Sequence, residues 1–218
     1  MKLMIVDDHQ VVRQGIANLL RSMLPAVAIT EVDNGQDAVA RYGELRPDVV
    51  LLDMGLPDIS GLEVGRRLRQ RWRGAAILFF TMHDELPMVR QALDIGGLGF
   101  VSKSCAPEEL AEAVKRVAAG QPYIEHPIAT RLAMNQERPV DHRLRDMTQR
   151  EMEVLLMYAR GESVGGIAER LCVSSKTVSN HLAGLKSKLQ VSSSVELIHL
   201  AVDAGLIRYG QLEEARRV

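Results

Sequence analysis

In Val49-Val50-Leu51-Leu52-Asp53-Met54-Gly55-Leu56-Pro57, four aliphatic residues run directly into a carboxylate. The aliphatic run, with Pro47 before it and Gly55 and Pro57 after it, predicts a strand that is buried on both faces. Strands of this kind belong to parallel sheets that helices cover on both sides. The carboxyl ends of such strands are where open α/β sheets bind their ligands, although an acid there can also cap a helix or close a turn.

The composition limits the class of protein. The chain has 218 residues, enough for one large or two ordinary domains, and 46% of them are hydrophobic. Its formal net charge of −1 means that any basic surface must be local. Two isolated cysteines, Cys105 and Cys172, are typical of reduced thiols in a cytosol. No apolar run approaches the ~20 residues of a membrane span, so we expect a cytoplasmic protein without a membrane segment.

The first half of the chain alternates short apolar runs with helical patterns, which predicts five βα units. We expect an α/β fold: a doubly wound, five-stranded parallel sheet with helices on both faces. The expected strands are Leu3–Val6, Ala26–Val32, Val49–Leu52, Ala76–Phe80 and Gly99–Ser102. The expected helices are Val11–Met23, Gln36–Leu45, Leu62–Arg71, Pro87–Ile95 and Glu108–Ala119.

Polar residues end four of these strands. They are Asp7 and Asp8 after the first strand, Asp53 after the third, Thr81 after the fourth and Lys103 after the fifth. Parallel strands end at one edge of a sheet, so we expect these side chains to lie together. Three clustered carboxylates repel one another unless a cation intervenes, and Mg²⁺ is a hard cation that prefers oxygen ligands.

This set of groups suits the transfer of a phosphoryl group. The Asp53 carboxylate can attack phosphorus while a metal ion neutralises the transferring oxygens. Lys103 and the Thr81 hydroxyl would hold the remaining oxygens. Each residue alone has an ordinary explanation, such as a helix cap or a solvated lysine, but all five at four strand ends favour a site.

Four segments in this half resemble the receiver domain of two-component response regulators. They are MIVDDH (4–9), VVLLDMGLPDISGLE (49–63), ILFFTMHDE (77–85) and GGLGFVSKS (96–104), and the resemblance covers roughly residues 1–120. It implies a flavodoxin-like fold in which Asp53 accepts the phosphoryl group from a sensor histidine kinase. It also implies that Asp7, Asp8, Asp53 and the Gly55 carbonyl bind Mg²⁺. Thr81 and Phe100 would be paired switch residues, and Lys103 would contact the phosphoryl group.

The second half is helical and begins after a linker, which we expect at residues 121–146 because Gly120, Pro122, Pro127 and Pro139 interrupt the pattern. One short helix over Ile128–Met134 fits within it. Residues 147–210 predict an all-α domain of four helices. These run from the Thr148 capping box to about Arg160, from Ser163 to Leu171, from Ser174 or Ser175 to about Gln190, and over Val195–Ala204. The spacing of the middle two is typical of a helix-turn-helix.

The third of these helices has the pattern of a DNA-recognition helix. Its apolar stripe is Val178, Leu182, Leu185 and Leu189, and it carries three lysines and no acid in a chain of net charge −1. Lysines favour phosphate contacts, and Asn180 can read a base edge. The residues that we expect to contact double-stranded DNA are Lys176, Thr177, Ser179, Asn180, Ala183, Ser187 and Lys188.

Three segments here resemble the LuxR-type helix-turn-helix: MTQREMEVL (147–155), RGESVGGIAERL (160–171) and CVSSKTVSNHLAGLKSKL (172–189). Joined to a receiver, this makes a response regulator of the NarL/FixJ type. The resemblance implies a transcription factor, not a metabolic enzyme, whose phosphorylation controls homodimerisation and promoter binding. The chain departs from the pattern at Gly165-Gly166, Gln190 and Ser194, which puts DNA affinity in doubt.

Two other functions remain open at this point. The first is a receiver that works by docking without phosphate, and the intact acidic set with Thr81 and Lys103 argues against it. The second is an aspartyl-phosphate phosphotransferase of the haloacid-dehalogenase type. That class needs a second Asp two residues after the nucleophile, where this chain has Gly55, and it leaves the helix-turn-helix unexplained.

Overall fold

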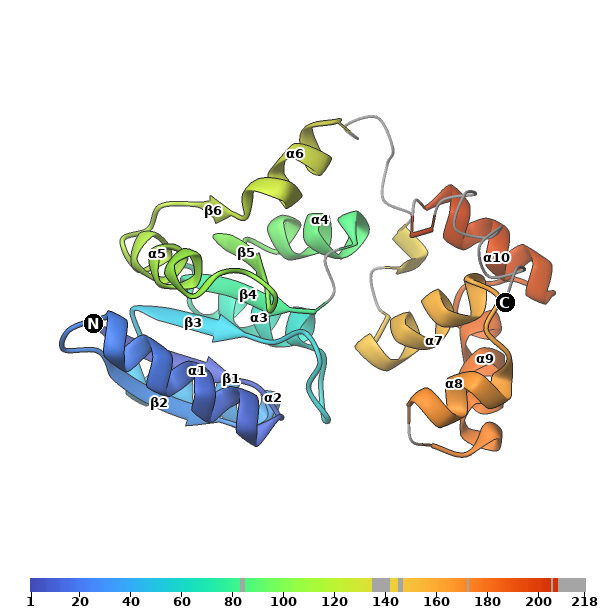
Figure 1. The fold of residues 1–218 in the computed structure, drawn as a ribbon, viewed down its shortest axis with the longest axis horizontal. Helices are drawn as coiled ribbons and strands as arrows, with labels where there is room; N and C mark the ends of the chain where they lie inside the picture. The colour runs from blue at the N-terminus through green and yellow to red at the C-terminus, as the bar shows by residue number, and fades with distance from the viewer. Residues whose placement is uncertain (83–84, 135–141, 145–146, 172, 205, 208–218) are drawn as a thin grey trace. The chain divides into compact units, whose positions relative to one another are not determined.

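The computed structural model describes residues 1–218 except 83–84, 135–141, 145–146, 172, 205 and 208–218 (Figure 1). The chain forms two compact units, Met1–Asn135 and Gln136–Val218. The first unit is an α/β layer structure and the second is helical.

The first unit is built on a parallel sheet with the strand order β2-β1-β3-β4-β5-β6. The strands are β1 (Lys2–Val6), β2 (Ala28–Val32), β3 (Val49–Leu52), β4 (Ile77–Thr81), β5 (Gly99–Ser102) and β6 (Tyr123–Ile124). The helices are α1 (Gln10–Met23), α2 (Gly35–Leu45), α3 (Gly61–Arg71), α4 (Leu86–Asp94), α5 (Pro107–Ala118) and α6 (His126–Met134). The first five strands have the order of the flavodoxin-like sheet, as expected.

Among the described residues the sheet has six strands, so the prediction of five was wrong by one. The additional strand β6 pairs with β5 through only two residues, opposite Gly99 and Phe100. Pro122 precedes it and Pro127 follows soon after, and prolines are compatible with an edge strand because they need no partner there. Residues 121–146, expected as a linker, therefore contain β6, the predicted short helix as α6, and a 3₁₀ turn (His142–Leu144).

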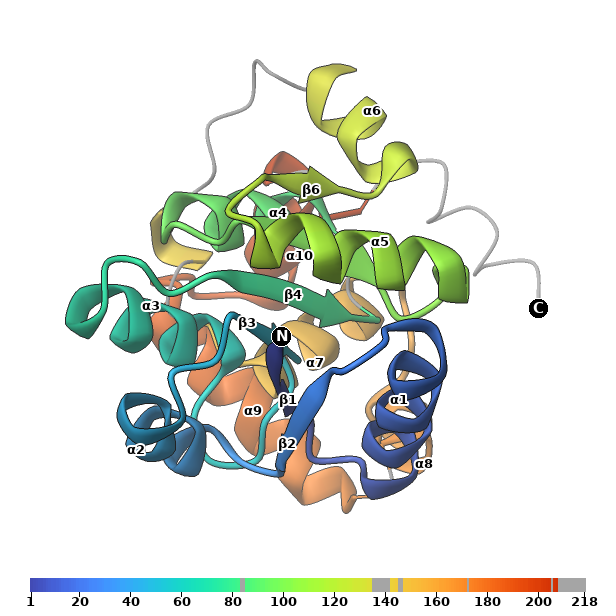
Figure 2. The same cartoon turned by 90° about the vertical axis from the view of Figure 1, so that its left-hand side faces the viewer.

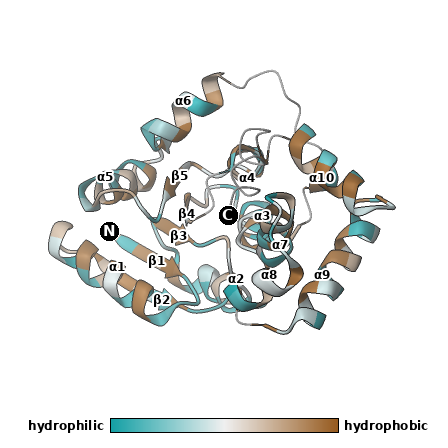
Figure 3. Ribbon diagram, turned by 45° about the vertical axis from the view of Figure 1, so that its right-hand side comes forward, coloured by the Kyte–Doolittle hydropathy of each residue, from teal (hydrophilic) through white to brown (hydrophobic). Residues whose placement is uncertain are grey.

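The central strands are buried on both faces, which explains their unbroken aliphatic sequences. All four residues of β3 and all five of β4 are buried. Helices α1 and α5 cover one face, and α2, α3 and α4 cover the other (Figure 2). The helices carry both hydrophobic and hydrophilic residues (Figure 3), because each turns an apolar stripe to the sheet.

The second unit contains the four predicted helices: α7 (Gln149–Ala159), α8 (Val164–Arg170), α9 (Ser175–Lys188) and α10 (Ser194–Asp203). Thr148 and Glu151 form the predicted capping box at the start of α7. The side chain of Ser163 caps α8, and the side chain of Ser174 caps α9. The end of the expected domain, residues 208–210, lies outside the described residues.

Within the described parts of the chain, no helix is both long enough and apolar enough to cross a membrane.

Candidate functional site

The predicted acidic residues meet at the carboxyl edge of the sheet. Asp7 and Asp53 directly follow β1 and β3, which are adjacent strands, and their residues are only 2% and 4% exposed. Asp8 is exposed beside them. Two buried carboxylates on neighbouring strands need a compensating positive charge.

Lys103 supplies a positive charge from the loop after β5. Its Nζ lies 2.7 Å from Asp53 Oδ2 and 2.7 Å from Asp7 Oδ2. Burial acts to lower the pKa of Lys103, but the two carboxylates outweigh it and the net shift is upward. Burial raises the pKa of Asp53, although Lys103 and the Gly55 backbone N–H oppose that shift. One ammonium therefore serves two carboxylates, and the cluster retains a net negative charge.

The cluster fits a divalent metal ion. One ligand atom from each of Asp7, Asp8, His9 and Asp53 can be chosen so that all four lie within 4.8 Å of one another. Carboxylate oxygens are the ligands that Mg²⁺ prefers. The sequence interpretation did not include His9, whose Nδ1 lies 2.7 Å from Asp8 Oδ1. Its position directly after the acid pair was the available signal.

The loop that carries Gly55 is fixed to the neighbouring helix by Asp58. Its carboxylate accepts the N–H groups of Gly35 at 2.8 Å and Gln36 at 2.7 Å, which are the first two residues of α2. Burial acts to raise the pKa of Asp58, but these and other backbone donors outweigh it and the net shift is downward. Asp58 was not predicted from the sequence as part of the site. It holds the loop in place and does not contact the acidic cluster's reacting groups in this account.

Asp58→Ala is expected to destabilise the first unit by about 1 kcal/mol, the usual loss for a removed helix cap. Because the folded pKa of Asp58 is lowered, its contribution is complete above the unfolded pKa and is lost as pH falls through the folded pKa. Urea unfolding followed by fluorescence of Trp72, the single tryptophan of the chain, measures this. Asp58→Asn, which keeps one acceptor oxygen, is the control. If Asp58→Ala lowers the free energy of unfolding by the same amount in acid as at neutral pH, the account is contradicted.

Thr81 and Phe100 occupy the positions that the resemblance implies for a switch pair. Thr81 is the last residue of β4, and Phe100 lies on β5. Both are fully buried, and the Phe100 ring stacks on Phe79 with 6.5 Å between ring centroids. The Thr81 carbonyl accepts the Lys103 N–H at 2.9 Å. In this structure Phe100 is therefore a core residue on a strand that β4 separates from β3.

Helix α9 has the two predicted faces. Val178, Leu182, Leu185 and Leu189 are buried, as the apolar stripe requires. Of the seven expected DNA contacts, Lys176, Ser179, Asn180, Ala183, Ser187 and Lys188 are exposed and Thr177 is half-buried. The Thr177 hydroxyl is hydrogen-bonded to Ser174 Oγ at 2.8 Å, which places Thr177 in the cap of the helix.

Lys188 is also held by its own domain. Its Nζ lies 2.6 Å from Oε2 of Glu151, the capping-box residue of α7. Burial acts to raise the pKa of Glu151, but Lys188 and Thr148 outweigh it and the net shift is downward. Glu151 therefore compensates the charge of Lys188 within this domain.

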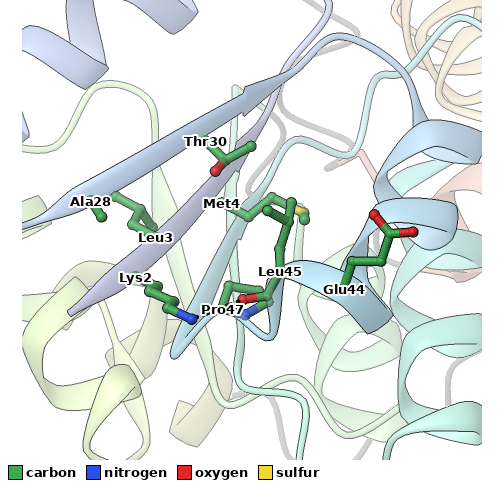
Figure 4. Close-up of a pocket in the computed structure, with 8 residues that line it drawn as sticks. All are labelled: Lys2, Leu3, Met4, Ala28, Thr30, Glu44, Leu45 and Pro47. Atoms are coloured by element: carbon green, nitrogen blue, oxygen red, sulfur yellow. Dashed lines mark hydrogen bonds between the residues drawn. The ribbon is translucent and has the colours of Figure 1, made fainter.

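A hollow of about 280 Å³ lies at the other end of the sheet, beside the first residues of β1 and β2 (Figure 4). Its size is at the lower limit for small-molecule sites, ~300 Å³. It is not part of the acidic cluster, since its lining comes from strand starts and from the end of α2. The lining residues are Lys2, Leu3, Met4, Ala28, Thr30, Glu44, Leu45 and Pro47.

Comparison with protein families identifies both units. The family described as response regulator receiver domain matches residues 3–115, and the family described as bacterial regulatory proteins, luxR family, matches residues 145–201.

Two curated relatives match nearly the whole chain. The transcriptional activator protein ExaE of Pseudomonas putida is 50% identical over 212 residues, covering 95% of this chain and 99% of the relative. The response regulator UvrY of Escherichia coli is 36% identical over 205 residues, covering 93% and 94%.

Solved structures agree with the fold. The RcsB response regulator in a complex with DNA superposes with a TM-score of 0.59 at 24% identity, covering 93% of this chain and 98% of that chain. A LuxR-family response regulator from Aurantimonas has a TM-score of 0.59 at 35% identity, covering 62% of this chain and 96% of that chain. The chain thus belongs to the response regulators of the NarL/FixJ type, DNA-binding transcription regulators with a receiver domain and a LuxR-type helix-turn-helix.

Proposed function

We propose that this chain is a cytoplasmic transcription factor that is switched by phosphorylation of Asp53. A sensor histidine kinase is the phosphodonor, and the phosphorylated chain binds double-stranded DNA as a homodimer. The observation that carries the proposal is the contact of Lys103 Nζ with both Asp53 and Asp7 at 2.7 Å. It supports a site in which a buried acid, a second acid and an ammonium face one another.

In this account Asp53 is the nucleophile. A carboxylate oxygen of Asp53 forms a bond to phosphorus while the bond from phosphorus to the donor imidazole nitrogen breaks, and the electron pair of that bond leaves with the imidazole. Asp7, Asp8, Asp53 and the Gly55 carbonyl would hold Mg²⁺, which would supply positive charge beside the transferring oxygens. Lys103 and the Thr81 hydroxyl then hold oxygens of the acyl phosphate.

In this proposal, Thr81 and Phe100 convert phosphorylation of Asp53 into a change of the receiver surface. A phosphoryl group on Asp53 attracts the Thr81 hydroxyl, and the Phe100 ring moves into the space that Thr81 leaves. The surface over α4, β5 and α5 changes as a result. Two chains paired through a changed surface place two α9 helices on adjacent half-sites.

The first test is the intact mass of the full chain after exposure to a small acyl phosphate with and without Mg²⁺. We expect one added phosphoryl group in the presence of Mg²⁺ only, and none in Asp53→Ala. Uptake that persists in Asp53→Ala would place the acceptor elsewhere. An unchanged wild-type mass, with a cognate kinase failing too, would favour a receiver that docks without phosphate.

For the DNA-binding surface, Lys176→Ala is expected to weaken binding on all sequences and to reduce the salt dependence of the binding constant by about one phosphate contact. Asn180→Ala is expected to change sequence preference, with a discrimination of about 1–3 kcal/mol at one base pair. Lys188→Ala is also expected to weaken binding on all sequences, because it removes a cation and leaves the Glu151 carboxylate, 2.6 Å from Lys188 Nζ, without its partner. Fluorescence anisotropy across salt concentrations measures all three, and a uniform loss from Asn180→Ala on every sequence contradicts base reading.

A further inference from the structure

Glu125, the residue after β6, is bonded to the end of β5 and to the start of α6. Its backbone N–H donates to the Phe100 carbonyl at 3.1 Å. Its carboxylate Oε2 accepts the backbone N–H of Ser102 at 2.7 Å. Its carbonyl accepts the N–H groups of Ile128 at 3.0 Å and Ala129 at 2.9 Å, in the first turn of α6. One residue therefore connects the strand that carries Phe100 to the helix that follows it.

The side-chain bond replaces a missing part of the sheet. Strand β6 pairs with Gly99 and Phe100 and then ends at Ile124, so its backbone offers no further acceptor to Ser102. Ser102 is only 9% exposed, and an N–H group at such a position needs a partner within the protein. The side chain of Glu125 meets this need, because its Oε2 accepts the Ser102 N–H at 2.7 Å.

The hydrogen bond between Ser102 and Glu125 lies next to Lys103, the residue that contacts the acidic cluster. Lys103 directly follows Ser102, and its own N–H is held by the Thr81 carbonyl at 2.9 Å. On the other side, the Ser104 N–H donates to Ser102 Oγ at 3.2 Å, and the Ser102 and Ser104 hydroxyls are 2.7 Å apart. The backbone on both sides of Lys103 thus depends on Ser102, and Ser102 depends on Glu125.

We propose that Glu125 is a positioning residue for phosphoryl transfer: its carboxylate fixes the end of β5 from which Lys103 reaches Asp53 and Asp7. This rests on the proposed function, since it needs Asp53 to accept a phosphoryl group. It also extends the site to β6, which lies beyond the matched receiver region at residues 3–115. Glu125 does not touch the reacting atoms and acts through Ser102 and Lys103.

The experiment measures the rate of phosphoryl uptake by the full chain from a small acyl phosphate with Mg²⁺, using intact mass. Glu125→Ala removes the acceptor and is expected to slow uptake about tenfold. Glu125→Gln keeps an acceptor oxygen at the same reach and is expected to stay within about twofold of wild type. Glu125→Asp keeps the charge but shortens the reach, so it is expected to be slow like Glu125→Ala. Glu112→Ala, at an exposed position of α5, is the matched control with no expected change.

The variants separate positioning from general stability. Thermal unfolding, followed by Trp72 fluorescence, establishes the temperature at which every variant is folded, and rates are compared there. If Glu125→Ala does not fold, the comparison of Glu125→Asp with Glu125→Gln still tests the proposal. Wild-type rates in both Glu125→Ala and Glu125→Asp overturn the proposal, and so does a Glu125→Gln rate as low as that of alanine. A wild-type chain that takes up no phosphoryl group from the small acyl phosphate or from a cognate kinase instead overturns the proposed function itself, and the role of Glu125 with it.

Discussion

Lys103→Met is expected to destabilise the first unit by about 3 kcal/mol in the absence of divalent cations. The substitution leaves the carboxylates of Asp7 and Asp53, whose side chains are 2% and 5% exposed, without the ammonium that lies 2.7 Å from each. Removing one partner of a buried ion pair leaves the charge of the other uncompensated. Denaturation by urea, followed by Trp72 fluorescence, gives the free energy of unfolding of this unit.

Millimolar Mg²⁺ is expected to recover much of that loss. A cation that binds only the folded chain stabilises it according to its affinity, and the variant has one positive charge fewer to compete with the metal ion. Lys115→Met, at an exposed position of α5, is the control and should change stability by less than about 0.5 kcal/mol. Equal stabilisation of wild type and Lys103→Met by Mg²⁺, or none of either, contradicts the assignment of the metal site.

Gly61→Ala is expected to be the second large effect, with a loss of about 3 kcal/mol in the stability of the first unit. A Cβ atom at Gly61 would lie 2.1 Å from the Asp53 carbonyl oxygen and 2.7 Å from Met54 Cα. Both are backbone atoms and cannot rotate away, so the segment that carries Asp53 must move. We therefore expect phosphoryl uptake to fall together with stability.

Gly15→Ala provides the matched control for this substitution. Gly15 lies inside α1, and nothing lies within 4 Å of a Cβ atom built there. Alanine is a better helix former than glycine, so a gain of about 0.5–1 kcal/mol is expected. Trp72 fluorescence during urea unfolding measures both variants. Similar free energies of unfolding for Gly61→Ala and Gly15→Ala would show that the backbone of Asp53 leaves room for a side chain at position 61.

The sheet edge was predictable because parallel topology leaves little freedom. Once Val49–Leu52 and the other apolar runs are strands of one parallel sheet, the residues after them share an edge. That reasoning is enough to bring Asp7, Asp53 and Lys103 together, and the structure adds that one ammonium contacts both acids. The helix starts were predictable from local capping chemistry, as Thr148 and Ser163 show.

The features that were missed depend on contacts without a local signal. Strand β6 has two residues, too few for an alternating pattern, so neither the sixth strand nor the Glu125–Ser102 bond was predictable from periodicity. The Lys188–Glu151 pair joins residues 37 positions apart and arises from the packing of α7 against α9. A count of lysines along α9 could not show that one of them is already paired.

The most direct test of the account compares the DNA affinity of the full chain before and after phosphorylation. Duplexes selected from a random pool serve as the ligand, and fluorescence anisotropy at fixed salt gives the dissociation constant. We expect phosphorylated wild type to bind about tenfold more tightly than the untreated chain, a typical coupling between two sites. Asp53→Ala should have the same affinity with and without the phosphodonor and Mg²⁺. Equal affinities for wild-type chain carrying and lacking the phosphoryl group would contradict the claim that Asp53 controls DNA binding.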